Sequence, residues 1–275
     1  MARVVIESKV RARRLRRRAL ATLAVILLLL AVFGAAVGLA HLPALRIVQV
    51  TVAAAPGESL SADQAQLIHD YAAQELSGDY LLLFPRDNAL LYPKSAIVQG
   101  LLKNFPALMS AAAGRSGWHT LSVVVGVREP VALWCGAVAA SSSPCFLLDA
   151  HGLAYAALSI SGNTFDRYFG ALTGDANPRQ YLSPQSFASL MALVAALKEV
   201  DASGVSSVSV DENNDVTVSF GDGFRLLFAL ADTDTTLQRF ALARRADVFM
   251  QHPLSDFEYL DLRFGDKLYY KLKNQ

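Results

Sequence analysis

The sequence predicts a mixed α+β protein with one N-terminal membrane-spanning helix and two exported domains, the second of them rich in β-strands. Three observations support this prediction. A strongly basic segment near the N-terminus is followed by a long uncharged run. Strand-like and helix-like segments then alternate over residues 43–129, and runs typical of β-strands dominate residues 130–275. We therefore expect an anchored protein whose folded domains lie on one side of a membrane.

The N-terminus has the pattern of a basic tail and a transmembrane helix. Residues 1–18 carry eight basic side chains and one acidic one, whereas the 24 residues 19–42 contain no Lys, Arg, Asp or Glu. As a helix at about 1.5 Å per residue this run spans roughly 36 Å, enough to cross a hydrocarbon core of about 30 Å. A signal peptide is the alternative, but its apolar region is normally about 7 to 15 residues. The positive-inside rule keeps the tail in the cytoplasm, so we expect the chain after Leu42 to be exported.

The exported part is acidic. Apart from the tail, 17 basic and 23 acidic side chains remain, a formal charge of −6. Because phosphate binding needs clustered positive charge, we expect no nucleic-acid partner. The sequence contains no phosphate-binding glycine loop, dinucleotide fingerprint or serine-hydrolase motif, and its five histidines are scattered without metal spacing. We therefore expect no enzymatic activity, no cofactor and no metal.

Cys135 and Cys145 are the only cysteines, and both lie in the exported part. Oxidising conditions are usual outside the cytoplasm, and strand-like flanks joined by a short loop of small residues could bring the two sulfur atoms together. A metal site is not expected, because no His or acidic cluster supplies the remaining ligands. Two buried free thiols are the alternative to the disulfide that we expect.

Residues 43–129 are expected to form a small α/β domain. Ser61 is a predicted helix N-cap, because Gln64 follows it at the spacing of a capping box. The predicted elements are a strand at 45–53, a helix at 61–76, a short buried strand or turn at 80–84, a helix at 93–104 and a long strand at 120–134, with Pro130 at a bend or sheet edge. A domain of this size is suited to docking rather than to an elaborate active site.

Residues 130–275 are expected to form a β-rich domain with helices packed on the sheet. The predicted elements are a hairpin at 146–158 around a turn at 149–152, an amphipathic helix at 187–200 that buries Phe187, Leu190, Met191, Val194 and Leu197, strands within 205–230, a helix at about 235–249 and a closing hairpin. Residues 211–222 have part of the acidic spacing of a calcium loop. However, Val216 stands where such a loop needs Gly and strands flank it, so we expect a hairpin turn.

The closing hairpin joins alternating runs at 259–264 and 267–272 through Gly265 and Asp266. Gly at the first central position accepts the positive φ of a type II′ turn. The last strand is predicted to be a sheet edge, which offers N–H and C=O groups to a partner strand. Its side chains alternate, with Leu268, Tyr270 and Leu272 on one face and Tyr269, Lys271 and Lys273 on the other. The alternative is a core hairpin whose lysines only prevent aggregation.

Three segments resemble, in the correct order, the FtsQ/DivIB family of bacterial cell-division proteins. VGVREPVALW at 125–134 is similar to the junction between the two exported domains of that family. FLLDAHGLAY at 146–155 resembles the hairpin that opens its second domain, and YLDLRFGDKLYYK at 259–271 resembles its last strand pair. The resemblance covers most of residues 19–275.

The resemblance implies a basic cytoplasmic tail at 1–18, a single transmembrane helix at 19–42, a POTRA domain with the order βαβαβ at 43–129 and a β domain at 130–275. It also implies a non-enzymatic divisome scaffold at the division site of the cell membrane. Such a scaffold binds small bitopic proteins of the FtsB and FtsL kind, and through them acts on the septal peptidoglycan synthase. Two alternatives remain open: another POTRA-type protein of secretion or envelope assembly, and a signal-anchored cell-wall enzyme.

The family's partner contacts, carried over to this chain, fall on the closing hairpin. They are Arg263, Phe264, Lys267, Leu268, Tyr269, Tyr270, Lys271 and Leu272. Relatives often have Tyr at the position of Phe264, so this chain lacks a hydroxyl group there. We expect Lys271→Pro to weaken partner binding if the Lys271 N–H faces the open edge. We also expect an exposed ion pair between Asp261 and Arg263, which would contribute about 0 to 1 kcal/mol.

Overall fold

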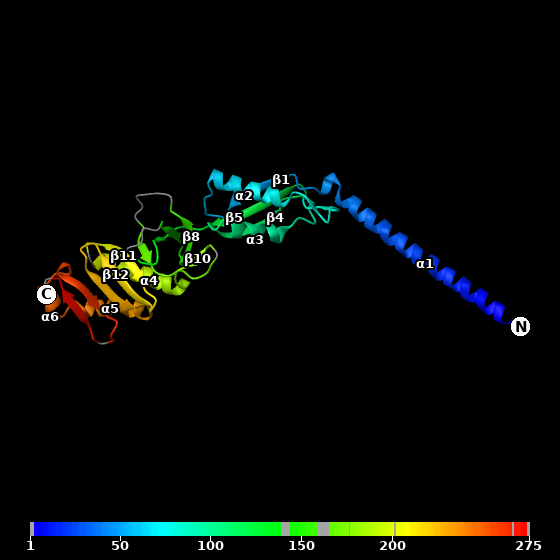
Figure 1. The fold of residues 1–275 in the computed structure, drawn as a ribbon. Coiled ribbons are helices and arrows are strands. Elements are labelled where there is room, and N and C mark those ends of the chain that lie inside the picture. The colour runs from blue at the N-terminus through cyan, green and yellow to red at the C-terminus, as the bar shows by residue number, and fades with distance from the viewer. Residues whose placement is uncertain are drawn as a thin grey trace. The chain divides into compact units, whose positions relative to one another are not determined.

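The computed structural model describes residues 3–138, 144–158, 165–175, 177–200, 202–265 and 267–273. The chain divides into two compact units, the first comprising residues 1–104 and 110–127 and the second residues 105–109 and 128–275. Figure 1 shows helix α1 and the three-stranded sheet of the first unit, followed by the larger sheet of the second. The short segment 105–109 belongs to the second unit, which a single boundary at 129/130 does not anticipate.

Helix α1 (Arg3–Ala40) begins inside the basic tail, so the tail and the apolar run form one continuous helix. The part from Arg13 to Ala40 reaches a mean hydropathy of 2.8 and is long and apolar enough to cross a membrane. Its leucines are exposed to the surroundings, as expected for a helix that faces lipid. The helix is compatible with a single membrane anchor, although length and composition by themselves do not distinguish it from a signal sequence.

Besides α1, the first unit contains a three-stranded sheet with the order β1-β5-β4 and two helices. Its elements are β1 (Gln49–Ala54), α2 (Ala62–Glu75), β2 (Asp79–Tyr80), β3 (Phe84–Pro85), α3 (Lys94–Asn104), β4 (Leu108–Arg115) and β5 (Thr120–Val127), with a 3-10 turn at Pro43–Leu45. β1 runs parallel to β5. The predicted capping box is confirmed, because Gln64 N–H donates to Ser61 Oγ and Ser61 N–H donates to Gln64 Oε1.

Two features of these strands differ from the prediction. β4 has no counterpart among the predicted elements, since its sequence LMSAAAGR holds small rather than β-branched residues. It is stabilised by its place beside β5, where Leu108 and Ala113 are buried. The strand predicted at 120–134 is two strands, β5 and β6 (Ala132–Trp134). Pro130 lies between them, and it lacks the N–H group that a continuous ladder needs.

The second unit is built on a mixed sheet with the strand order β10-β8-β7-β6-β9-β11-β12-β13-β14-β15. Besides β6, its strands are β7 (Phe146–Leu148), β8 (Leu153–Ala157), β9 (Arg167–Phe169), β10 (Arg179–Gln180), β11 (Val205–Val210), β12 (Asp215–Phe220), β13 (Arg225–Ala229), β14 (Phe257–Asp261) and β15 (Tyr269–Leu272). The helices are α4 (Pro184–Val200), α5 (Thr233–Ala243) and α6 (Asp247–Gln251), with 3-10 turns at Leu230–Asp232 and Leu254–Asp256.

The helices of the second unit differ in two details from those predicted. α4 buries four residues of the predicted stripe and also Leu193, whereas Met191 is only partly buried. The single helix predicted at 235–249 is divided into α5 and α6. Ala246 is extended between them, and Phe249 then stacks on Phe257 with 4.4 Å between the ring centroids. Burial of the Phe249 ring therefore accompanies the break in the helix.

Arg128 and Asp149 connect separate segments of the second unit through a buried ion pair, in which Arg128 Nη1 contacts Asp149 Oδ2. Arg128 Nε also donates to Pro106 O over 3.1 Å, which attaches the segment 105–109 to this unit. Asp149 Oδ1 accepts the N–H groups of His151 and Leu153 at 2.9 and 3.0 Å. Two of the segments that carry the family resemblance thus meet at one pair of side chains.

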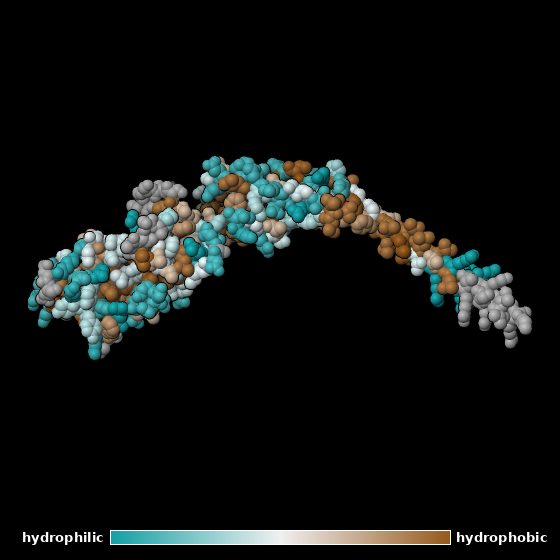
Figure 2. Space-filling view, viewed as in Figure 1, coloured by the Kyte–Doolittle hydropathy of each residue, from teal (hydrophilic) through white to brown (hydrophobic). Residues whose placement is uncertain are grey.

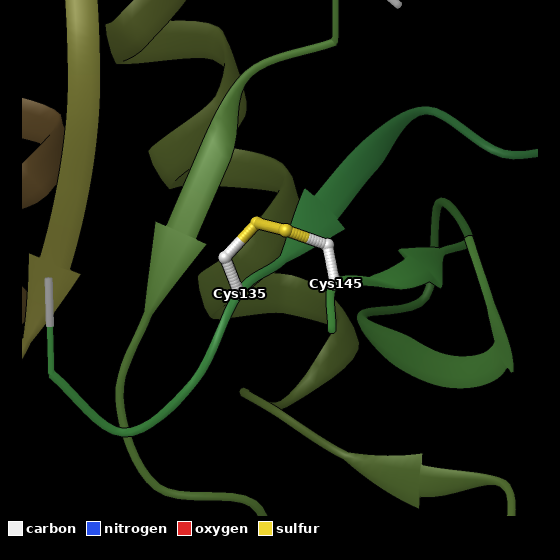
Figure 3. The surroundings of a disulfide bond; sticks show 2 residues. All are labelled: Cys135 and Cys145. Carbon is white, nitrogen blue, oxygen red and sulfur yellow. A yellow bond between two sulfur atoms is a disulfide. The ribbon is translucent and has the colours of Figure 1, made fainter. Parts of the chain in front are cut away.

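Cys135 and Cys145 form a disulfide with an S–S distance of 2.01 Å (Figure 3). Cys135 directly follows β6 and Cys145 directly precedes β7, so the bond closes one end of this antiparallel strand pair. Cys135 is buried beside Leu133 and Phe169 in a small cluster of its own. The bond therefore joins two neighbouring strands of the sheet.

Candidate protein-binding edge

The closing hairpin is formed by β14 and β15, which pair antiparallel. Gly265 has φ +62° and Lys267 N–H donates to Phe264 O over 3.1 Å, so a tight turn lies at the tip. Asp266, the second predicted turn residue, lies outside the described residues. The connection between the strands is longer than predicted, because β14 ends at Asp261 and β15 begins at Tyr269. One reason is that Arg263 N–H donates to Asp261 Oδ1 over 3.0 Å instead of continuing the ladder.

β15 forms one edge of the large sheet, and no described segment pairs with its outer side. The opposite edge strand, β10, is two residues long, and Thr173 pairs with its outer side. There, Thr173 and Gln180 exchange backbone hydrogen bonds of 2.7 and 3.1 Å. Of the two edges of this sheet, β15 is therefore the one at which another strand could add.

The backbone of β15 alternates between β14 and the open side. Lys273 N–H donates to Asp256 O over 2.9 Å, so it points toward the β14 side. Because the direction of the N–H and C=O groups alternates along a strand, those of Tyr269 and Lys271 also point toward β14. The N–H and C=O groups of Tyr270 and Leu272 therefore point toward the open side. The expected effect of Lys271→Pro depended on the Lys271 N–H facing the open edge, and this condition is not met, because that N–H points toward β14.

One face of the hairpin lies against α5 and α6. The ring of Tyr270 contacts Phe249 and Phe257, with centroids 5.7 and 5.8 Å apart, and Leu272 packs against the core. Leu268 lines a hollow of about 350 Å³ on this face. The other residues that line it are Arg239, Leu242, Ala243, Ala246, Leu262, Gly265 and Lys267. An apolar side chain could therefore be received beside the start of β15.

The opposite face carries two exposed aromatic rings. Phe264 and Tyr269 lie edge to face with centroids 5.1 Å apart, and each residue is about half exposed, 53% and 50%. They border a second hollow of about 450 Å³. It is also lined by Arg225, Leu227, Tyr259, Asp261 and Arg263. Apolar rings beside charged groups are typical of the surfaces that proteins use for binding one another.

Arg263 is held by two carboxylates. Its Nη1 donates to Asp215 Oδ2 and its Nη2 to Asp261 Oδ2, each over 2.6 Å. These hydrogen bonds raise the pKa of Arg263 above its usual value. Burial alone would raise the pKa of Asp261, but the hydrogen bonds and the charge of Arg263 outweigh it and lower that pKa. The pair between Asp261 and Arg263 is present as predicted, but Asp261 is buried, 5% exposed, rather than at the surface.

The lysines of the hairpin have different surroundings. Lys271 Nζ contacts Glu258 Oε2 over 2.7 Å, and their hydrogen bond raises the pKa of Lys271 and lowers that of Glu258. Lys273 Nζ donates to backbone oxygens of Asp222 and Ser255. Among the described residues, Lys267 makes no ion pair and is the lysine most available to an acidic partner group.

The structure gives the acidic segment 211–222 a structural role. Asp211 Oδ1 accepts the N–H groups of Asn213 and Asp215 at 2.8 and 2.9 Å, and Asn214 has φ +62°, so this is the predicted hairpin turn between β11 and β12. The described residues contain no group of three or more His, Cys, Asp or Glu side chains that could hold a metal. The sequence did not indicate that Asp215 of this hairpin binds Arg263, because 48 residues separate them.

The sequence also did not indicate that residues of α5 line the hollow beside Leu268. Leu242 looks like an ordinary exposed helix residue, and only the packing of α5 beside the closing hairpin makes it line a hollow with Leu268.

Compared with models of known protein families, the chain matches none, and it matches no curated protein. The geometry and the residue-level resemblance therefore carry the functional argument.

Proposed function

We propose that this chain is a membrane-anchored, non-enzymatic scaffold of bacterial cell division, similar to FtsQ/DivIB proteins. Its first unit corresponds to the POTRA domain of that family and its second unit to the β domain. It binds small bitopic division proteins of the FtsB and FtsL kind, and through them it influences septal peptidoglycan synthesis. The single observation that supports this function best is the open edge at β15.

Strand addition at β15 fits the surrounding surface. A partner strand would form hydrogen bonds with the outward main-chain groups of Tyr270 and Leu272. Side chains that alternate along that strand would point to the two faces of the sheet, where the hollows beside Leu268 and Tyr269 lie. The exposed rings of Phe264 and Tyr269 would lose contact with water, which stabilises a complex by about 25 cal/mol per Å² of apolar area buried. In this arrangement the edge supplies affinity and the hollows supply specificity.

Partner recovery from host membranes tests the proposal. The tagged full-length protein is purified in detergent from its own host as wild type, Tyr270→Ala and Tyr270→Pro, and proteins that co-purify are identified by mass spectrometry. Both variants lose the same ring, but only the proline also loses the outward N–H group. We expect small single-pass proteins with coiled-coil sequences to be recovered with wild type, to be reduced with Tyr270→Ala and to be lost with Tyr270→Pro.

Two results would contradict the proposal in different ways. Equal recovery of the partners by wild type and both variants would place the contact away from β15. Failure of the wild type to recover any small single-pass protein would argue against the scaffold itself. Phe264→Ala, which removes an exposed ring without touching the ladder, is expected to weaken recovery. Both Tyr270 variants lose the packing of that ring on Phe249 and Phe257, so a cooperative thermal transition above the temperature of the experiment, rather than an equal midpoint, confirms that each form is folded.

A further inference from the structure

Two leucines at the tip of the β2–β3 hairpin are the most exposed large apolar residues among those that the structure describes. Leu81 is 87% exposed and Leu82 is 91% exposed. Leu90 and Leu91, which follow the hairpin, are 61% and 43% exposed. Single exposed leucines are ordinary in soluble domains. Two adjacent leucines at one tip, however, form an exposed hydrophobic patch whose contact with water is unfavourable.

The backbone holds this tip in a conformation that leucine rarely adopts. Leu81 and Leu82 have φ +51° and +61°, in the left-handed region, where a residue other than Gly typically costs about 1 kcal/mol or more. Leu83 N–H donates to Tyr80 O and Arg86 N–H donates to Gly78 O, each over 3.0 Å, so the turn is closed by hydrogen bonds. Gly or Asn would fit these positions with less strain. The leucine side chains are therefore presented outward despite an unfavourable backbone.

The hairpin lies beside α1. The ring of Phe84 packs edge to face on Phe33 of the apolar run, with 6.1 Å between the centroids. Figure 2 shows the apolar surface of α1 continuing onto the adjacent end of the first unit. The hairpin that carries the exposed leucines thus contacts the apolar surface of the candidate membrane-spanning helix.

Hydrogen bonds and an ion pair fix the hairpin to the end of α1. Asn88, only 1% exposed, donates from Nδ2 to the carbonyl oxygen of Ala40 over 2.8 Å, at the last turn of the helix. Ala89 N–H donates to Leu45 O, and Ile47 N–H donates to Asp87 O, both over 2.7 Å. Arg46 Nη2 contacts Asp87 Oδ2 over 2.7 Å. The segment that follows the hairpin is therefore joined both to the last turn of α1 and to residues 45–47, which follow α1.

The depth of the hairpin follows from the charges on α1. If the hydrocarbon core begins just after Arg18, about 20 helical residues cross its 30 Å and bring its far boundary close to Gly38. Phe33 then lies about 8 Å inside that boundary, at five residues of about 1.5 Å each. Phe84 packs on Phe33 and therefore lies at a similar depth, within the range of about 5 to 10 Å that is typical of interfacial segments.

We propose that the tip of the β2–β3 hairpin, Leu81 and Leu82, inserts into the acyl chains of the leaflet on the side of the folded domains. The occupant of this apolar surface is lipid, because the surface is continuous with α1 and fixed to its end. Tyr80 lies at the base of the hairpin with the guanidinium of Arg86 over its ring, 5.3 Å from the centroid, a pair suited to the headgroup region. The inference requires α1 to remain uncleaved, and it is independent of the proposed division function.

Spin labelling of the full-length protein in vesicles tests this contact. The described cysteines are joined in a disulfide, so a cysteine introduced at Leu82 is the free thiol to label. Leu82→Cys, Leu28→Cys in α1 and Leu67→Cys on α2 are each labelled with a nitroxide and reconstituted in phosphatidylethanolamine and phosphatidylglycerol. Leu28 and Leu67 are themselves exposed, 64% and 57%, and serve as lipid and water references. Collision of the label with oxygen and with a water-soluble nickel chelate is then measured by power saturation.

We expect the Leu82 label to lose nickel collisions and gain oxygen collisions relative to the Leu67 label, and to lie at a shallower depth than the Leu28 label. Equal nickel collisions at Leu82 and Leu67, with Leu28 protected, would show that the hairpin stays in water and would overturn the proposal. A Leu28 label that is as accessible as Leu67 would overturn the membrane anchor and the proposal with it. The protein is alone with lipid, so a partner protein cannot cause the protection.

Discussion

Arg263 joins two carboxylates that lie far apart in the sequence, Asp215 on β12 and Asp261 on β14. The resemblance places Arg263 among the partner contacts, yet its guanidinium already has partners within the second unit. Its neighbours Phe264 and Tyr269 are half exposed and have no comparable internal role. At the residue scale the hairpin therefore contains two kinds of residue. Arg263 positions the strand end, and the two aromatic rings are exposed and form the surface that we propose for partner binding.

Removal of Arg263 tests this structural role. Arg263→Ala leaves the buried carboxylate of Asp261 without its cation, so we expect the free energy of unfolding to fall by about 2 to 3 kcal/mol. Arg263→Lys keeps the charge but cannot form the bidentate hydrogen bonds of a guanidinium, so we expect a smaller loss in the free energy of unfolding. Thermal unfolding of the full-length protein in detergent measures both, and an unchanged midpoint for Arg263→Ala would contradict the assignment.

The pH dependence of unfolding is a control for the same pair. The pKa of Asp261 is lowered in the folded protein, so its contribution to stability is present above about pH 4 and is lost as the pH falls through the folded pKa. The difference between wild type and Asp261→Asn should therefore be largest near neutral pH and shrink in acid. A difference that does not vary with pH would exclude the charge of Asp261 as its source.

At the scale of elements, the disulfide closes the β6–β7 strand pair, which lies inside the sheet rather than at its edge. We expect a maleimide to label neither cysteine of the folded protein before reduction and both after reduction and denaturation. Closing so short a loop contributes about 2 to 3 kcal/mol in the chain-entropy estimate, so the reduced protein should unfold at a lower temperature. Equal masses after alkylation with and without reduction would disprove the bond.

The closing hairpin shows which part of an element can be predicted from its own residues. The alternation at 267–272 correctly predicts the two faces of β15, because side-chain direction along a strand is a local property. The length of the connection depends on Arg263, which interrupts the ladder by binding Asp261 and Asp215. The direction of the Lys271 N–H depends on its register with β14, and the sequence of one strand does not contain that register.

At the scale of the whole molecule, the proposed anchor and the proposed division function make one joint prediction. A fluorescent fusion to the N-terminal tail, produced in the native host, should give signal concentrated at the septum of dividing cells. The physical reason is that a membrane anchor restricts diffusion to two dimensions, and partner binding at β15 would then concentrate the protein where its partners assemble. Tyr270→Pro should spread the signal around the envelope, whereas the matched Tyr270→Ala should retain part of the septal signal. A uniform signal for wild type would favour a secretion or envelope-assembly role instead.

The sequence by itself determined the features that depend on neighbouring residues. These are the apolar run of α1, the capping box at Ser61 and Gln64, the buried stripe of α4 and the turn at Gly265. Each arises from backbone conformation, periodicity or hydropathy within a few helical turns or one strand, so a short window of sequence contains its cause.

Only the tertiary structure decided which segments meet. It placed β4 beside β5, joined Arg263 to Asp215, left β15 at an open edge and packed Phe84 of the β2–β3 hairpin on Phe33 of α1. Sheet order, the pairing of distant charges and the exposure of an edge depend on the balance of packing and chain entropy over the whole unit. Any one of these segments is compatible with several neighbours, and only the packing of the complete unit selects among them.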